Sequence, residues 1–358
     1  MPIITVSKLH KTFRTKHKPA GLRGSLSALA HPEWKTVEAV KDLAFEMEPG
    51  ELLGFIGPNG AGKSTTIKIL TGILYPTSGE AQVLGFIPWQ QRQKLAYQVG
   101  TVFGQRPQLW YHLPAIDTFY LFGKIYEMDD GDLRKRIAFL TEAFEIEELL
   151  ETPVRMLSLG QRMRCEVAAS LLHHPKLLLL DEPSIGLDVV AKQRIRDTVK
   201  RMNELEGVGV LLTSHDAGDI EALCRRVIVI NHGKIVYQDK VSSLKRRYLT
   251  SKLVEVRYAE QVSEDFHIAG TETIKVAKER YGVKLRFDTH LTAVGHVIAQ
   301  LADAGSLVDV TVSDPSLEEV IRAIYQETET GDWREHLGKN FLEIYSESRF
   351  RSSPRVYR

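Results

Sequence analysis

The sequence predicts an α/β fold with a mainly parallel sheet, an antiparallel β-subdomain, an inserted helical subdomain and a small C-terminal α+β domain. Apolar runs of strand length at 51–56, 177–181 and 208–213 alternate with stretches whose apolar residues have helical spacing. Such alternation needs crossover connections and is typical of a parallel sheet covered on both faces. The stretch 113–172 is helical without strand signals, which predicts the inserted subdomain.

The composition indicates a chain of two domains with no overall charge that would attract a polyanion. It has 358 residues, of which 43% are hydrophobic, and its 47 basic and 46 acidic residues nearly cancel. We therefore expect no nucleic-acid partner. Only Cys165 and Cys224 are present, both in segments expected to be helical, which favours a reducing compartment such as the cytosol.

The longest apolar runs are far shorter than the ~20 residues that cross a bilayer, and the N-terminal residues do not resemble a secretory signal. Any function at a membrane therefore requires docking on a partner protein.

The N-terminal segments 3–13 and 37–47 carry β-rich apolar residues, which predicts a β-layer ahead of the main sheet. The basic insertion 14–35 lies between them and contains Gly, Pro and Ser. We expect a long loop or a short helical insertion there, solvated in preference to bound to lipid headgroups.

A glycine-rich loop follows the strand at 51–56. Its sequence, GPNGAGKS at 57–64, fits the pattern G-x-x-x-x-G-K-[ST] between a strand and a helix, which disfavours a chance glycine-rich turn. Glycines let backbone N–H groups turn toward phosphates, Lys63 reaches the β- and γ-phosphates, and the Ser64 hydroxyl ligates Mg²⁺. The chain is therefore predicted to be a P-loop NTPase. Its predicted nucleotide contacts here are Gly57, Pro58, Asn59, Gly60, Ala61, Gly62, Lys63, Ser64 and Thr65.

A second motif, LLLLDEP at 177–183, is an apolar strand ending in two carboxylates. The strand brings Asp181 to the sheet edge beside the phosphate loop, where it is expected to hold Mg²⁺. Glu182 is then placed to act as general base on the attacking water. The alternative, a solvated acidic strand end, is disfavoured by the phosphate loop.

The sequence LSLGQ at 157–161 completes a resemblance to ABC-type nucleotide-binding domains. In that family this motif opens a helix whose N-terminus faces the γ-phosphate held by the opposite subunit. The resemblance therefore implies nucleotide contacts in trans from Ser158, Gly160 and Gln161. Leu159 replaces the commoner glycine, and a serine that merely caps a helix is the alternative.

Three further positions match the family in order and spacing. Gln105 falls at the Q-loop, where its amide is expected to touch Mg²⁺ and the attacking water. Asp188 closes SIGLD, the D-loop at the dimer interface. His215, after a predicted buried strand, matches the switch histidine that senses the γ-phosphate. Gln105 and His215 thus join Glu182 as predicted catalytic residues.

The family stacks adenine on an aromatic residue after its first strand, and Phe13 aligns with that residue. Stacking needs only a flat π face. Trp34 is a competitor for this role, and packing in the core is the alternative for Phe13.

The resemblance implies an ATP-hydrolysing subunit of an ABC transporter, with ATP and Mg²⁺ as cofactors. Two copies, most simply a homodimer, are expected to close on two ATP molecules at the cytoplasmic face of the cell membrane and to drive a separate permease. The phosphate-loop region and the ending DPSLEEVI are similar to ABC-2-type exporters, so export is expected. An importer, a heterodimer, or a soluble ABC-type ATPase acting on ribosomes or DNA are the alternatives.

The helical subdomain is expected at about 108–172. Its Trp110, Phe119 and Tyr120 either present an apolar surface to the permease or belong to the subdomain core.

The domain boundaries follow from changes in pattern along the chain. We expect the ATP-binding domain over 1–245, an α+β domain over 246–327 and a polar tail over 328–358. Three short strands, VEVRY, VKLRF and LVDVTV, and helices at 291–303 and 316–326 are predicted in the second domain.

Overall fold

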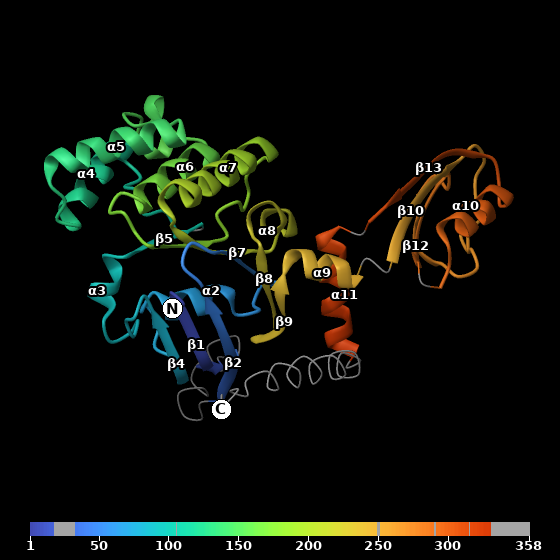
Figure 1. The fold of residues 1–358 in the computed structure, drawn as a ribbon, viewed down its shortest axis with the longest axis horizontal. Helices are drawn as coiled ribbons and strands as arrows, with labels where there is room; N and C mark the ends of the chain where they lie inside the picture. Colours follow the sequence, from blue (N-terminus) through green and yellow to red (C-terminus); the bar gives the residue numbers. More distant parts are fainter. Residues whose placement is uncertain (18–32, 105, 249–250, 290, 315, 331–358) are drawn as a thin grey trace, which may run out of the picture. The chain divides into compact units, whose positions relative to one another are not determined.

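The chain divides into two compact units, Met1–Ser242 and Ser243–Arg358, in a computed structural model (Figure 1). The structure describes residues 1–17, 33–104, 106–248, 251–289, 291–314 and 316–330.

The first unit is built on a six-stranded sheet. Five strands are parallel and the sixth, at the edge, is antiparallel to its neighbour. The order is β5 (Val99–Phe103), β6 (Leu177–Asp181), β7 (Gly209–Ser214), β3 (Leu52–Ile56), β8 (Arg226–Asn231) and β9 (Lys234–Lys240). Because β6 and β7 are buried along their whole length, their sequences do not alternate but are apolar up to the polar residues at their carboxyl ends. The predicted mainly parallel sheet is confirmed.

Helices cover both faces of this sheet (Figure 1). On one face, α2 (Lys63–Leu70) contacts β6 and also the antiparallel strands below it. On the other, α6 (Leu159–Ser170) contacts β5, and α7 (Val189–Glu206) packs between α6 and α8 (Ala217–Leu223). A short helix, α3 (Arg92–Ala96), contacts β5.

The predicted antiparallel layer has the order β2-β1-β4. It consists of β1 (Ile4–His17), β2 (Glu33–Met47) and β4 (Ser78–Val83), the last of which the sequence did not predict. The expectation of a loop or helix over 14–35 is wrong at both ends, because Arg14 pairs with Thr36 and Lys16 with Trp34. Once the hairpin is in register, each further backbone pair satisfies hydrogen-bonding groups, so the ladder continues through polar residues. Residues 18–32 of this insertion lie outside the described residues.

The helical subdomain is confirmed between β5 and β6. It contains α4 (Ala115–Ile125), α5 (Asp130–Phe144), the short 3₁₀ turns Glu147–Leu149 and Val154–Met156, and α6. The three aromatic residues singled out in the sequence differ in burial. Phe119 is fully buried and belongs to the core, whereas Trp110 and Tyr120 are 53% and 47% exposed.

A stacked ring pair joins this subdomain to the sheet. Tyr126, which caps α4, lies parallel to His173, with ring centroids 3.9 Å apart and an interplanar angle of 8°. Nε2 of His173 is 3.3 Å from the carbonyl oxygen of Val99 in β5, and its buried Nδ1 has no hydrogen-bond partner among the described residues. Burial lowers the pKa of His173 to about 4, so the ring is neutral near pH 7.

The second unit contains a four-stranded antiparallel sheet of order β11-β12-β10-β13. The helix α9 (Val241–Tyr248) spans the boundary between the units. The later elements of the second unit are β10 (Ser251–Tyr258), β11 (Glu272–Val276), β12 (Gly282–Asp288), α10 (Val294–Asp303), β13 (Leu307–Ser313) and α11 (Leu317–Thr330). Buried residues of β10 and β12, including Leu285 and Phe287, form its core with Val297 and Leu301 of α10.

Several sequence expectations for this unit need correction. The sequence did not predict α9 or β11, and β11 alternates only weakly between buried and exposed residues. The helix expected from 291 begins at Val294, because Leu291 is 85% exposed and precedes it in a turn. The helix expected over 316–326 continues to Thr330, into the predicted polar tail, and the remainder of that tail lies outside the described residues.

Candidate active site

The phosphate loop connects β3 to α2, as the sequence predicted. Two glycines in it have backbone angles that favour glycine, with φ of 82° at Gly60 and 108° at Gly62. A Cβ on Gly62 would lie 2.3 Å from the carbonyl oxygen of Ala39, and one on Gly57 would lie 2.5 Å from that of Ile230. The loop is therefore held tightly against β2 and β8, and Gly57 and Gly62 leave no room for a side chain.

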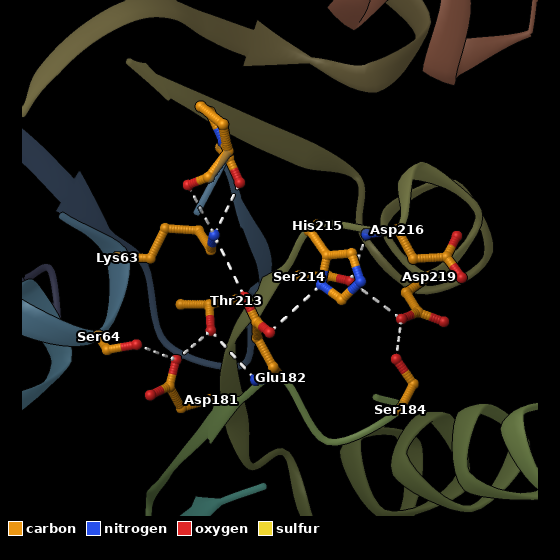
Figure 2. A network of polar contacts seen from close by, with 12 residues as sticks. Lys63, Ser64, Asp181, Glu182, Ser184, Thr213, Ser214, His215, Asp216 and Asp219 are labelled. Carbon is orange, nitrogen blue, oxygen red and sulfur yellow. Dashed lines mark hydrogen bonds and ion pairs between the residues drawn. The ribbon is translucent and has the colours of Figure 1, made fainter. Parts of the chain in front are cut away.

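Lys63 is almost completely buried at the start of α2. Its Nζ donates to the carbonyl oxygens of Gly57, at 2.7 Å, and Pro58, at 3.2 Å, and lies 3.2 Å from Oε1 of Glu182. A buried ammonium needs such partners to offset its lost hydration. The lysine is thus fixed by its own loop and by the carboxylate predicted to be the general base (Figure 2).

Glu182 lies between two basic side chains. Its Oε1 faces Lys63, while Oε2 is 3.2 Å from Nδ1 of His215. Its backbone has a φ of 54°, in the left-handed region that non-glycine residues seldom adopt. The backbone N–H of Glu182 donates to both the carbonyl oxygen and the hydroxyl of Thr213, at 3.0 and 3.2 Å. The turn after β6 therefore aims the carboxylate into the space between Lys63 and His215.

Asp181 is the last residue of β6 and is buried. Its Oδ1 accepts from the hydroxyl of Ser64, at 3.1 Å, and from that of Thr213, at 2.6 Å. This brings the hydroxyl and the carboxylate predicted to hold Mg²⁺ into direct contact. Thr213 was not singled out from the sequence. Its position, two residues before His215 on a predicted buried strand, was the available signal that its hydroxyl would need a hydrogen-bond partner.

The residues predicted to act across the dimer interface, those of LSLGQ at 157–161 and Asp188, form a second cluster at the N-termini of α6 and α7. Ser158 caps α6, its Oγ accepting from the N–H of Gln161 at 3.2 Å and its own N–H donating to Oε1 of Gln161 at 2.8 Å. Asp188 caps α7 in the same way, accepting from the N–H of Ala191. A Cβ on Gly160 would lie 2.7 Å from that of Ala191, so glycine allows the two helices to approach closely.

Leu159, which replaces the family's usual glycine, packs toward the loop between Glu182 and α7. A Cβ on Gly186 of that loop would lie 3.1 Å from Cδ2 of Leu159. The leucine is nevertheless 36% exposed, and Met156, Val189 and Val190 beside it are more exposed still. An apolar surface thus surrounds the N-termini of α6 and α7.

Phe13 belongs to neither cluster. Phe13 lies in β1 opposite Val37, with Nζ of Lys11 5.1 Å from its ring centroid. Gln105 lies outside the described residues. The segment that follows it is held by Glu166 of α6, a buried carboxylate that sequence reasoning missed.

The Glu166 carboxylate accepts from the backbone N–H of Gln108, at 3.0 and 3.2 Å, and from that of Leu109, at 3.4 Å. Burial raises the pKa of Glu166, although these hydrogen bonds act in the opposite direction. The helix that begins with the signature motif therefore also anchors the chain just after Gln105.

The fold and the first cluster together define a P-loop ATPase. A buried lysine in a glycine-rich loop, a serine paired with an aspartate at the end of a parallel strand, and an adjacent glutamate are the parts that phosphoryl transfer to water requires.

Comparison with known proteins identifies the family. A family model described as ABC transporter matches residues 40–185. The chain is 31% identical over 210 residues to the ABC transporter ATP-binding protein NatA of Bacillus subtilis (strain 168), covering 59% of this chain and 85% of NatA. It is also 31% identical over 287 residues to the linearmycin resistance ATP-binding protein LnrL of the same organism, covering 78% of this chain and 91% of LnrL. The chain belongs to the ATP-binding proteins of ABC transporters and is an ATPase.

A solved structure supports the fold. The dimeric, post-hydrolysis structure of an ATP-binding cassette bound to ADP and phosphate is similar with a TM-score of 0.55 and 24% identity. It covers 66% of this chain and 98% of that one.

Proposed function

We propose that this chain hydrolyses Mg²⁺-ATP between two copies of itself and thereby drives a separate membrane permease, most simply an exporter. The observation that carries the proposal is the position of Glu182, held at 3.2 Å from both Lys63 and His215 beside the phosphate loop.

The residues of the first cluster suit each part of the reaction. The ammonium of Lys63 would turn from Glu182 to the β- and γ-phosphates, because the phosphates carry more negative charge than one carboxylate. That exchange frees Glu182 to accept a proton from the attacking water. His215, whose side chain is 47% exposed, stays within reach of both the carboxylate and the γ-phosphate. Phe13 is proposed to stack on adenine, and Gln105 to orient the attacking water.

The Ser64 hydroxyl and the Asp181 carboxylate fit Mg²⁺, since both are hard oxygen donors and they lie 3.1 Å apart. Among the described residues no group of three or more His, Cys, Asp or Glu side chains could hold a metal alone. This fits an ion whose other ligands are water and substrate phosphates. When bound, Mg²⁺ neutralises charge that develops on the phosphates.

A second copy is proposed to complete the site with Ser158, Gly160, Gln161 and Asp188. Two helix N-termini at this surface present partial positive charge, which favours a phosphate brought by the partner. The exposed apolar side chains of Met156, Leu159, Val189 and Val190 support burial of this surface in a dimer.

A permease is proposed to dock on the helical subdomain, where Trp110 and Tyr120 are exposed. No helix within the described ranges is long and apolar enough to cross a membrane. We propose that the protein lies at the cytoplasmic face of the cell membrane, attached through that permease. Export is favoured because LnrL is named for resistance to linearmycin.

One experiment tests the proposal in two stages. Steady-state phosphate release by the purified full-length chain is expected to require Mg²⁺-ATP and to be lost in Lys63→Ala, while Lys192→Ala is a matched control outside the phosphate loop. Cross-linking in native membranes followed by mass spectrometry is then expected to recover a polytopic membrane protein. Recovery of ribosomal or DNA-repair proteins without any membrane protein would instead favour a soluble ATPase.

A further inference from the structure

One buried carboxylate connects the two loops that carry Glu182 and His215. Asp219 of α8 is only 2% exposed, and its Oδ2 accepts from the hydroxyls of Ser184 and Ser214 (Figure 2). Ser184 is two residues after Glu182, and Ser214 immediately precedes His215.

The orientation of this carboxylate is fixed from its other side. Arg196 of α7 donates to Oδ1 of Asp219 from Nε, at 2.9 Å, and from Nη2, at 2.5 Å. Because both of these guanidinium nitrogens donate to Oδ1, Oδ2 is left to the two serine hydroxyls. A paired and fully hydrogen-bonded buried charge of this kind is rigid, since each lost contact leaves a desolvated polar atom.

Neither reacting side chain is fixed by packing alone. His215 is half exposed, and Glu182 has the strained backbone described above, held on its N-terminal side by Thr213. On its C-terminal side, the Ser184 hydroxyl bonded to Asp219 joins it to the loop of His215.

We propose that Asp219 is a positioning residue that keeps Glu182 and His215 at hydrogen-bonding distance by tying Ser184 to Ser214. The proposal rests on the function proposed above, because it concerns the residues of that reaction. Loss of the tie would let the two loops separate, and a misplacement of about 1 Å can lower a rate about 100-fold. ATP binding would be kept, since Lys63 is held by its own loop.

A neighbouring ion pair provides the matched control. Lys192 of α7 donates to Oδ2 of Asp216 at 2.6 Å, so it also joins α7 to the start of α8. Burial alone would raise the pKa of Asp216, but the hydrogen bonds from Lys192 and the N–H of Gly218 lower it overall, as expected for a formed pair. Removing Lys192 breaks a link between the same helices and leaves the Ser184–Asp219–Ser214 tie intact.

The test compares Asp219→Ala, Asp219→Asn, Ser184→Ala and Lys192→Ala in the full-length chain. Both kcat for ATP hydrolysis and the Kd of a non-hydrolysable ATP analogue are measured for each. Asp219→Ala is expected to lower kcat about 10- to 100-fold while the Kd changes less than about twofold. Lys192→Ala is expected to change neither by more than about twofold.

Asp219→Asn is expected to recover most of the activity. Its amide oxygen can accept from Arg196, while its NH₂ group can donate to the serine hydroxyls, which accept as well as donate. A purely structural contribution of the buried charge would instead leave this neutral variant as impaired as Asp219→Ala.

A double-mutant comparison isolates the positioning role. If Asp219 acts through His215, then Asp219→Ala should add little to the loss already caused by His215→Ala. Additive losses would overturn the proposal, as would an Asp219→Ala protein with wild-type kcat.

Should Asp219→Ala fail to fold, Ser184→Ala decides, because it removes one hydroxyl and leaves the ion pair with Arg196. A kcat equal to wild type in that variant overturns the inference. Absence of ATP hydrolysis by the wild-type chain would overturn the proposed function itself, whereas normal turnover in both the wild type and Asp219→Ala overturns only the inference.

Discussion

Acidification is expected to destabilise the first unit through His173. In the folded chain its pKa is about 4, against 6.5 for an ordinary histidine, because burial disfavours the protonated ring. A base with a lowered folded pKa contributes stability that is complete above the unfolded pKa. That contribution declines as the pH falls below 6.5 and is lost once the pH passes about 4.

The size of the effect follows from the same two values. The difference between 6.5 and about 4 corresponds to roughly 3 kcal/mol, and solvent screening of the partly exposed ring reduces this to about 2 kcal/mol. The physical source is the stack on Tyr126 and the burial of Nδ1, which would carry the new proton and has no hydrogen-bond acceptor in the described part of the chain.

Urea unfolding at pH 7 and pH 4.5, followed by tryptophan fluorescence, measures the loss in wild type and in His173→Phe. Phenylalanine keeps an aromatic ring against Tyr126 but cannot be protonated. Its missing hydrogen bond to Val99 affects both pH values and cancels in the difference. The exposed His112, replaced in His112→Phe, controls for removal of an imidazole elsewhere. Equal losses in wild type and His173→Phe between the two pH values would refute the reasoning.

Three further results are expected. Glu182→Gln should lower ATP turnover about 10²- to 10⁴-fold and yield an ATP-bound dimer on size exclusion, because the amide cannot take the proton from water; a monomer in saturating Mg²⁺-ATP contradicts this. Phe119→Ala should lower the free energy of unfolding by about 3–5 kcal/mol, whereas Trp110→Ala should cost less than about 0.5 kcal/mol and weaken recovery of the permease; equal stability losses would contradict the division between core and surface. Gly62→Ala should raise the Kd of a fluorescent ATP analogue more than about tenfold, since its Cβ would lie 2.3 Å from the oxygen of Ala39, and an unchanged Kd would contradict the tight fit.

The sequence predicted the parts of the fold whose signals are local. The glycine-rich loop, the LLLLD strand and the helical stretch before it each carry their own pattern, and all three occur where expected. The continuation of β1 and β2 through polar residues such as Arg14 and Lys16 depends on pairing across the hairpin, which no window of a single strand reveals.

The same contrast applies to the candidate site. The five residues Lys63, Ser64, Asp181, Glu182 and His215 were predicted from motifs, and the structure joins them in one network. Asp219 and Glu166 were missed because most of their partners lie 23 or more residues away in the chain, and only Ser214 is near Asp219 in sequence, so the packing of helices on loops is needed to reveal them. An acidic residue that is buried in a helix is marked in the sequence only by the apolar residues beside it.

The left-handed backbone of Glu182 has an evolutionary consequence. A non-glycine residue in this conformation costs about 1–2 kcal/mol, so the backbone conformation by itself would favour glycine at this position. Selection for turnover therefore maintains a carboxylate against a standing penalty in stability. In a duplicated copy of this chain that was no longer required to hydrolyse ATP, glycine at this position would remove that backbone cost but would leave the buried ammonium of Lys63 without its carboxylate partner. Such a copy would therefore lose the carboxylate only together with a compensating change beside Lys63.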